Sequence, residues 1–209
     1  MPKPTKKASS RKKKGIYAIH PGFEMVESVI ANLKQKTGHS LKEWEKLLKE
    51  KGPRNNKNWS SWLKDRHKMG TNTARFVAER AAGIELKYEP DAYVEAMFAA
   101  PRQGLRPIYE EILNFSLKLG NDVTVTPCKT IVPLRRRFVF AQVKPVSNTK
   151  IELGLALGNT KAGGPVVSTG GLAKGDRITH KIPILTSQDF GTEARKWLER
   201  AYALCPPLD

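Results

Sequence analysis

Three consecutive arginines, Arg135, Arg136 and Arg137, form a group of residues that could do chemistry. They lie in the stretch TPCKTIVPLRRRFVFAQVKP, between two runs that have the pattern of short strands. We expect Arg135 and one neighbouring arginine at the end of a hairpin, beside Lys129 and Lys150. Clustered guanidinium groups can bind a phosphate or a carboxylate. A solvated turn explains the same residues equally well, because runs of surface charge are common and contribute little individually.

The strand expected to start near Arg136 carries two phenylalanines, and their environment decides what the strand can bind. Phe138 and Phe140 fall on the same face as Gln142 if side chains alternate regularly. An open face would imitate the basic and aromatic platform on which RNA-binding sheets stack bases. The RNA-binding signature has glycines beside its aromatic residues, and RRRFVFAQV has none, so we predict that both phenylalanines belong to the core.

Two other reactive side chains, His180 and Cys128, have no recognisable partners in the sequence. His180 is in phase with Ile182 on an apolar stripe, where a histidine is usually a core or edge residue. Cys128 precedes Lys129, but no base that would activate a thiol is evident. The only other cysteine, Cys205, is distant, and no metal-binding spacing occurs. We therefore predict no catalytic residue, no metal site and no cofactor.

The chain is strongly basic, with 37 Lys and Arg against 20 Asp and Glu and a formal net charge of +17. Residues 1–14 hold 7 basic and no acidic residues, residues 15–89 hold 14 and 9, and residues 90–209 hold 16 and 11. A field of this sign attracts polyanions, which favours nucleic acid over small acidic metabolites as the partner. The alternative is that the basic segment only keeps the protein soluble, because charge governs association and not fold.

Residues 21–84 have the apolar periodicity of a four-helix, all-α module. The run TGHS closes the first helix, and Ser40 with Glu43 forms a capping box for the second. The third helix begins near Trp59, and the fourth follows the run HKMGTN. The tryptophans of this module are expected in its core and not at a ligand site.

The turn RHKMGTNTARFVAE, between the third and fourth helices, has half of a helix-hairpin-helix element, whose backbone N–H groups face a phosphate. Gly70 supplies one glycine of that element, but the first glycine of the usual pair is missing. Arg66, Lys68 and Arg75 surround the turn and would suit DNA. The favoured interpretation is a plain tight connection in which a glycine stops the helix.

Residues 102–209 change from helical to alternating periodicity, which is typical of an α+β domain. An amphipathic helix precedes Gly120, and a last helix lies within residues 187–205. Between them we expect five strands in an antiparallel meander: DVTVTP, KTIVPL, RFVFAQVKP, KIELGLALG and RITHKIPI. The clean alternation of KIELGLALG predicts one buried and one open face. The fold class is therefore α+β, with a four-helix all-α module followed by a helix, a five-stranded meander and a helix.

The glycine-rich stretch GNTKAGGPVVSTGGLAKGDR, residues 158–177, connects the last two expected strands. It is neither a P-loop nor a dinucleotide fingerprint, because its lysines are wrongly placed and no helix follows a strand there. A connection this long is commonly functional or mobile. It could act as a lid over the sheet or be a flexible insert.

The runs MVESVIANLKQKTGHSLKEW, RHKMGTNTARFVAERAAG and LRPIYEEILNFSLKLGNDVTVTPCKTIVPLRRRFVFAQVKP resemble an uncharacterised bacterial two-domain family. The similarity extends from about residue 22 to about residue 204. Members join a small helical domain of unknown function to a C-terminal domain labelled "predicted transport protein", which is also similar to YdhG-like α+β domains. The resemblance implies an α+β fold and brings no established activity. Members tend to carry Lys-Lys-Thr or a similar run before the second strand, where this chain has Cys128, Lys129 and Thr130. They also tend to have a paired arginine after that strand, here Arg135 and Arg136, and a Thr-His-basic step in the last strand, here Thr179, His180 and Lys181.

The chain is expected to divide into four parts. These are a disordered basic arm over residues 1–20, a helical domain over residues 21–84, a linker with a short helix over residues 85–101, and an α+β domain over residues 102–209. No stretch reaches the roughly 18 apolar residues that a membrane helix needs, and no signal-peptide core follows the arm. We therefore expect a cytoplasmic protein with no membrane partner, which could associate with the nucleoid.

The sequence favours a non-enzymatic protein that binds DNA or RNA with weak sequence preference. One alternative is a protein or enzyme that binds a small anion between Lys129, Arg135 and His180, and another is a module that docks acidic protein partners. The residues expected to contact nucleic acid or an anion are Lys6, Lys7, Arg11, Lys12, Lys13, Lys14, Arg66, Lys68, Gly70, Arg75, Lys129, Arg135, Arg136, Arg137, His180 and Lys181.

Overall fold

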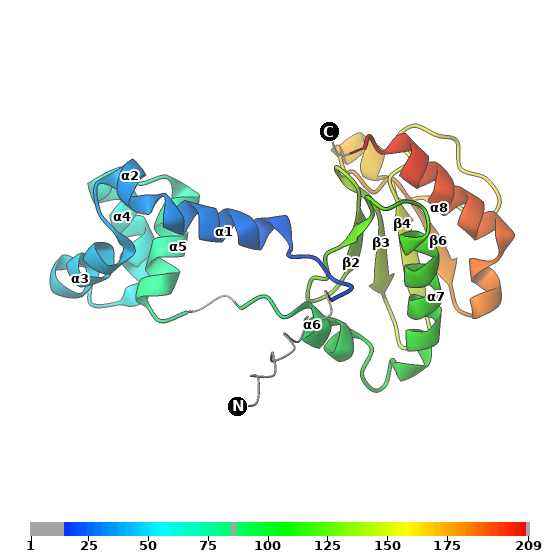
Figure 1. Ribbon diagram of the computed structural model, residues 1–209, viewed down its shortest axis with the longest axis horizontal. Coiled ribbons are helices and arrows are strands. Elements are labelled where there is room, and N and C mark those ends of the chain that lie inside the picture. The colour runs from blue at the N-terminus through cyan, green and yellow to red at the C-terminus, as the bar shows by residue number, and fades with distance from the viewer. Residues whose placement is uncertain (1–14, 85–86, 208–209) are drawn as a thin grey trace, which may run out of the picture. The chain divides into compact units, whose positions relative to one another are not determined.

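The structure is a computed structural model that describes residues 15–84 and 87–207. The chain folds as two compact units, shown in Figure 1. The helical unit comprises Ile19–Pro90, and the α+β unit comprises the chain from Asp91 onward together with the segment that ends at Ala18. The α+β fold class predicted from the sequence is confirmed.

The helical unit contains the predicted helices, with the first divided in two at Asn32. Gly38 ends the second helix in the left-handed region, with φ 80°, and Ser40 then begins the third. The predicted capping box is present, because the backbone N–H of Ser40 donates to Glu43 Oε2 at 2.6 Å and Glu43 N donates to Ser40 Oγ. The elements are α1 (Pro21–Ala31), α2 (Leu33–Thr37), α3 (Leu41–Lys51), a 3₁₀ turn (Asn56–Asn58), α4 (Trp59–His67) and α5 (Thr71–Ala81).

Tryptophans anchor the core of the helical unit, as predicted. Trp44 and Trp59 are buried, and Trp62 packs partly buried against the same cluster. Each buried indole N–H has an acceptor, since Trp44 Nε1 donates to Thr37 Oγ1 and Trp59 Nε1 donates to the carbonyl of Pro53, both at 2.9 Å. These bonds remove the cost of burying a polar group and fix the orientation of both rings.

The α+β unit contains all five predicted strands and a sixth, β5, that the sequence did not predict. The strands form an antiparallel sheet in the order β1-β2-β3-β4-β6-β5. β5 lies within the glycine-rich connection and pairs with β6, so the connection provides an edge strand instead of a simple loop. The elements are α6 (Pro90–Met97), α7 (Arg106–Leu117), β1 (Thr124–Val125), β2 (Val132–Arg135), β3 (Val139–Pro145), β4 (Ile151–Leu155), β5 (Val167–Ser168), β6 (His180–Ile184) and α8 (Thr192–Leu204).

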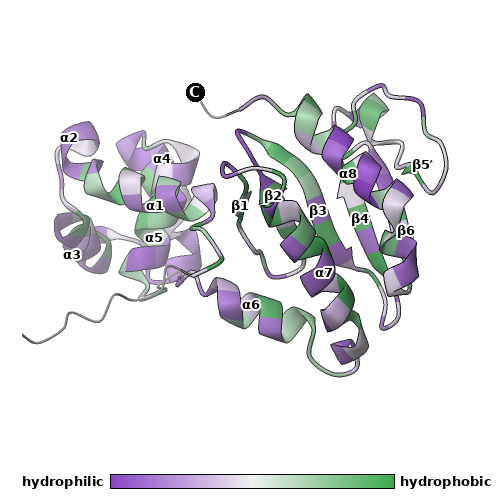
Figure 2. Cartoon of the chain, turned by 45° about the vertical axis from the view of Figure 1, so that its right-hand side comes forward, coloured by the Kyte–Doolittle hydropathy of each residue, from purple (hydrophilic) through white to green (hydrophobic). Residues whose placement is uncertain are grey.

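Helices α7 and α8 cover one face of this sheet, as Figure 1 shows. The alternation predicted for β4 is confirmed, because Ile151, Leu153 and Leu155 are fully buried against the helices. On the other face Glu152 forms an ion pair with Lys181 of β6 at 2.7 Å. Figure 2 shows that α7 and α8 carry both hydrophobic and hydrophilic residues, and that hydrophobic residues are frequent in β3.

The regular alternation predicted for β3 is wrong at one point, because the pairing of β2 with β3 contains an irregularity. Leu134 pairs with Ala141 and Arg135 pairs with Val139, which leaves Phe140 as an extra residue. Phe140 is fully buried and its ring meets Tyr202 of α8 with centroids 5.5 Å apart. The prediction that Phe140 belongs to the core is confirmed.

Segments assigned from the sequence to the arm and the linker contact the α+β unit. The hydroxyl of Tyr17 lies 3.0 Å from that of Tyr109 on α7, and Ala18 N donates to the carbonyl of Val125 on β1 at 2.8 Å. Helix α6, expected within the linker, contributes Val94 and its neighbours to the core of the sheet domain. The chain therefore leaves the α+β unit after Ala18 and returns to it at α6.

Candidate functional site

The helical unit contains a pocket of about 460 Å³ whose wall is rich in basic groups. Its lining comes from the end of α2, the turn before α3, α3 itself and the turn between α4 and α5. No aspartate or glutamate is part of this lining. We call it the cationic pocket, and its residues are Lys36, Thr37, His39, Trp44, His67, Lys68, Met69, Gly70 and Thr73.

Two tight turns bring the basic residues of the cationic pocket together. Gly38 reverses the chain after α2 in a conformation that favours glycine, so that Lys36 and His39 line the same pocket. Lys68 ends α4 in the left-handed region, with φ 53°, and the next residue, Met69, is buried. The prediction that a glycine stops this helix is wrong, because Gly70 has φ −60° and is the N-cap of α5.

Trp44 holds the two imidazoles of the pocket in place. Its ring meets His39 at a centroid distance of 4.9 Å and His67 at 5.0 Å, both edge-on. His67 also contacts Trp62, with centroids 4.7 Å apart. Since Trp44 is itself fixed by its hydrogen bond to Thr37, the imidazoles lie on a rigid wall.

The electrostatics of the pocket favour an anion. The positive charge comes from Lys36 and Lys68, because burial, followed by the nearby Arg66 and His39, lowers the pKa of His67 and favours its neutral imidazole. The Nε2 atom of His67 is buried and has no hydrogen-bond partner among the described residues. Helix α5 begins at the pocket with Gly70, no side chain caps its first N–H groups, and no acidic residue lies in its first turn. Unsatisfied donors and the positive end of the helix dipole add to the charges of Lys36 and Lys68.

The residues that the sequence predicted around the α4–α5 turn are only partly brought together. Lys68 and Gly70 line the cationic pocket, whereas Arg75 lines a separate hollow of about 250 Å³ and its guanidinium lies over the ring of Phe76 at 4.8 Å. Arg66 is exposed on α4 and lines neither of the two hollows. The sequence did not predict Lys36, because its place beside the turn depends on the packing of residues about thirty positions apart.

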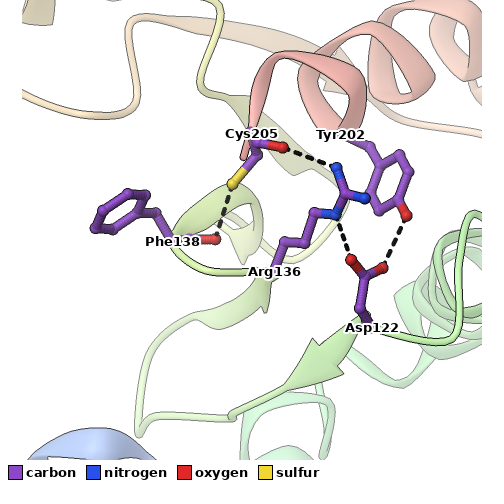
Figure 3. Close-up of polar contacts among 5 residues, drawn as sticks. All are labelled: Asp122, Arg136, Phe138, Tyr202 and Cys205. Carbon is purple, nitrogen blue, oxygen red and sulfur yellow. Dashed lines mark hydrogen bonds and ion pairs between the residues drawn. The ribbon is translucent and has the colours of Figure 1, made fainter. Parts of the chain in front are cut away.

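The arginine triplet lies at the end of the β2–β3 hairpin, and its three members have different environments. Arg136 forms an ion pair with Asp122, donates from Nη1 to the carbonyl of Cys205 at 2.9 Å, and lies 4.4 Å over the ring of Tyr202 (Figure 3). Tyr202 in turn donates to Asp122 Oδ1 at 2.8 Å. Arg136, followed by Tyr202, lowers the pKa of the Asp122 carboxyl. The charge of Arg136 is therefore used inside the protein, where it ties the hairpin to the end of α8.

Phe138, in the same hairpin, is exposed, so the prediction that it belongs to the core is wrong. It retains 40% of its accessible surface, and Figure 3 shows its ring directed away from the Arg136 network. The guanidinium of Arg177 lies 4.3 Å from the centre of the ring, and that of Arg137 lies 5.8 Å from it. The Sγ of Cys205 contacts the carbonyl of Phe138 at 3.5 Å. We call Phe138, Arg177 and Arg137 the hairpin surface.

The expected grouping of Arg135 with Lys129 and Lys150 is wrong. Lys129 lies in the turn before β2 and Lys150 in the turn before β4, at the end of the sheet opposite to the Arg135 hairpin. Arg135 and Lys129 therefore lie at the two ends of β2, and the proposed small-anion site of Lys129, Arg135 and His180 is not assembled. Lys181, which the sequence also predicted as an anion contact, forms an ion pair with Glu152 on the open face of the sheet.

His180 and Cys128 show no catalytic arrangement among the described residues. His180 is 5% exposed, and its Nδ1 lies 2.9 Å from Thr179 Oγ1, as expected for a satisfied core histidine. Burial raises the pKa of the Cys128 thiol, against a smaller lowering by Arg135, which keeps the thiol protonated. Within residues 15–84 and 87–207 no three His, Cys, Asp or Glu side chains are grouped to hold a metal ion. The predicted contacts Lys6, Lys7, Arg11, Lys12, Lys13 and Lys14 lie outside the described residues.

Comparison with protein families matches each unit to a separate domain. Residues 25–82 match the Domain of unknown function (DUF4287), and residues 94–204 match the Domain of unknown function (DUF5655). The two matched ranges fall within the helical unit and the α+β unit. No curated protein and no solved structure matches the chain. Because the second match covers more than half of its residues, the chain belongs to the DUF5655 family, here joined to a DUF4287 domain.

Proposed function

We propose that this protein binds the phosphates of nucleic acid through the cationic pocket, with weak sequence preference and without catalysing a reaction. The observation that supports the proposal is the composition of the pocket: two lysines, two histidines and the uncapped N-terminus of α5 line it, and no carboxylate does. Groups of this kind bind phosphate oxygens by charge and by hydrogen bonds from backbone N–H groups.

The net charge of the chain supports a polymeric anion over a single small one. Residues 1–14 alone hold 7 basic and no acidic residues, and the formal net charge of the chain is +17. Each lysine or arginine that neutralises a phosphate releases counterions, so affinity for a polyanion grows with the number of contacts. Contacts to phosphates carry no sequence information, which gives the weak sequence preference.

A small anionic ligand is the second candidate, because the volume of the cationic pocket falls within the range of small-molecule sites. An acidic protein partner would use the same charges. Competition separates these candidates, since inorganic phosphate at low concentration would displace nucleic acid only if the pocket were built for a small anion. An acidic protein partner would remain bound when nucleic acid is removed with nuclease.

Three further expectations depend on this proposal or on the resemblance seen in the sequence. A cytoplasmic protein associated with the nucleoid would meet DNA and RNA, and we propose that location. We also propose that the α+β unit is related to YdhG-like domains. For the label "predicted transport protein" we propose no mechanism, and among the described residues no helix has both the length and the apolar character to cross a membrane.

The test is the binding of a fluorescent duplex and a fluorescent single strand by the full chain and by a chain that lacks residues 1–14, across a salt series. We expect both proteins to bind at low salt, with an affinity that falls steeply as salt increases and a shallower fall for the shortened chain. If neither protein binds either nucleic acid at low salt, the proposal is wrong.

A further inference from the structure

We propose that the hairpin surface is a second contact, at which Phe138 and Arg177 stack against an unpaired base of single-stranded nucleic acid. This inference rests on the proposed function and adds a preference to it: the cationic pocket binds phosphates of any nucleic acid, while the hairpin surface selects strands whose bases are accessible. The hairpin surface lies wholly within the α+β unit, and the pocket lies wholly within the helical unit.

Phe138 is exposed in a position that the fold holds firmly. Its carbonyl accepts a hydrogen bond from the Sγ–H of Cys205 (Figure 3). Arg136, two residues earlier, forms an ion pair with Asp122 and donates to the carbonyl of Cys205. The buried Phe140 anchors the other side of the hairpin through its contact with Tyr202. A large apolar ring that is both exposed and rigidly placed loses little conformational entropy when a flat partner stacks on it.

The neighbours of Phe138 are the groups that a nucleotide requires. Arg177 places its guanidinium 4.3 Å from the centre of the ring, so a planar cation and a planar apolar group are adjacent at the surface. Bases stack on aromatic rings and on guanidinium planes, and the same cations attract the flanking phosphates. The turn that carries Phe138 also contains Arg137, whose guanidinium lies 5.8 Å from the ring.

A hollow of about 470 Å³, which Arg177 helps to line, gives a bound nucleotide room. Its wall also contains Asp176, Thr179 and Leu204, together with other residues of the glycine-rich connection. The exposed Leu172 and Leu204 line it as apolar groups, and the side chains of Asn159 and Thr160 also belong to residues of its lining. The glycine-rich connection therefore contributes Arg177 to the hairpin surface and is not only a linker between strands.

Stacking on Phe138 favours a single strand over a duplex. In a duplex each base is already stacked on its neighbours, so a side chain can stack on it only after the base has been unstacked, which costs free energy. A single strand presents base faces without this cost. An acidic protein would bind the arginines but would gain little from the exposed ring, so removing the ring distinguishes the two partners.

The experiment compares the full chain with Phe138→Ala and with the control Phe138→Tyr, which keeps an aromatic ring. Each protein is titrated with an oligothymidine, with a strand of the same length that lacks bases, and with a duplex. We expect Phe138→Ala to lose roughly tenfold in affinity for oligothymidine, with little change for the abasic strand and the duplex, and Phe138→Tyr to bind like the parent chain. Thermal unfolding of both variants confirms that the fold is intact.

The other outcomes overturn the inference in distinguishable ways. If the parent chain binds all three probes and Phe138→Ala does not change the binding of oligothymidine relative to the abasic strand, the stacking site does not exist and the proposed function survives. In that case the contact of Arg177 with Phe138 only holds the glycine-rich connection in place, and backbone hydrogen exchange in residues 158–177 should be faster in Phe138→Ala than in the parent chain. If the parent chain binds none of the probes, the proposed function and this inference both fail.

Discussion

The sharpest test of the cationic pocket is to remove its two lysines and measure how binding depends on salt. The double variant Lys36→Gln/Lys68→Asn removes two positive charges from the lining. Neither lysine has an ion-pair partner among the described residues, so the substitutions break no ion pair. Asparagine suits position 68 because Lys68 has φ 53°, and asparagine tolerates the left-handed region better than most residues.

The expected magnitude follows from the number of contacts removed. The logarithm of affinity falls with the logarithm of salt concentration with a slope of about −0.9 for each phosphate contact on B-form DNA. Loss of two contacts should make the slope shallower by about 1.8. At about 0.1 M salt the same relation gives roughly an eightfold loss per contact, or about 60-fold for both lysines.

The assay is fluorescence anisotropy of a labelled duplex with the full chain at several salt concentrations between about 50 and 200 mM. The matched control is Lys42→Gln/Lys49→Gln, which removes two exposed charges from α3 that do not line the pocket. The control should change the slope by much less than one. If both double variants change the slope equally, the binding comes from the overall positive charge of the protein, and the cationic pocket is not a phosphate-binding site.

Three further predictions concern the α+β unit. Leu153→Ala should lower the free energy of unfolding of that unit by about 2–5 kcal/mol, because Leu153 is fully buried, and denaturation followed by circular dichroism measures the loss. Gly120→Ala should lower the Tm, because a Cβ there would lie 2.0 Å from the hydroxyl oxygen of Tyr202, and an unchanged Tm in calorimetry would contradict that packing. Arg136 holds the pKa of the Asp122 carboxyl below its ordinary value of 3.8, so the stabilisation from this ion pair is complete above about pH 3.8 and is lost as the pH falls through the lowered pKa. The Tm of Asp122→Asn should therefore fall less on acidification than the Tm of the parent chain.

The elements that could be predicted from the sequence are those whose signals are local. The alternation of β4 places Leu153 and its neighbours on one face, and the structure buries those residues. The spacing of Ser40 and Glu43 gives the capping box, because the hydrogen bonds of a cap join residues only three apart. The two helices that flank the sheet follow in the same way from their apolar periodicity.

The errors arise where distant packing overrides a local rule. A single extra residue in the β2–β3 pairing breaks regular alternation, so Phe140 is buried and Phe138 is exposed. The turn after α4 uses Lys68 in the left-handed region, where a glycine would be the usual choice. Lys36 and Lys68 line the same pocket although they lie far apart in the sequence, and no spacing within the sequence encodes that proximity.

The density of basic residues in the sequence is a poor guide to the residues that can bind a polyanion, because the fold neutralises some of them. Arg136, in the centre of the arginine triplet, is paired with Asp122 and bonded to the end of α8, and Lys181 is paired with Glu152. Lys36 and Lys68 lie outside the arginine triplet, yet they line a pocket without carboxylates. A charge that has no internal partner costs nothing to redirect toward a phosphate, whereas a paired charge must first break its existing contact. For this reason charge removal at the pocket should weaken binding more than removal of Arg136, whose loss should appear first as a loss of stability.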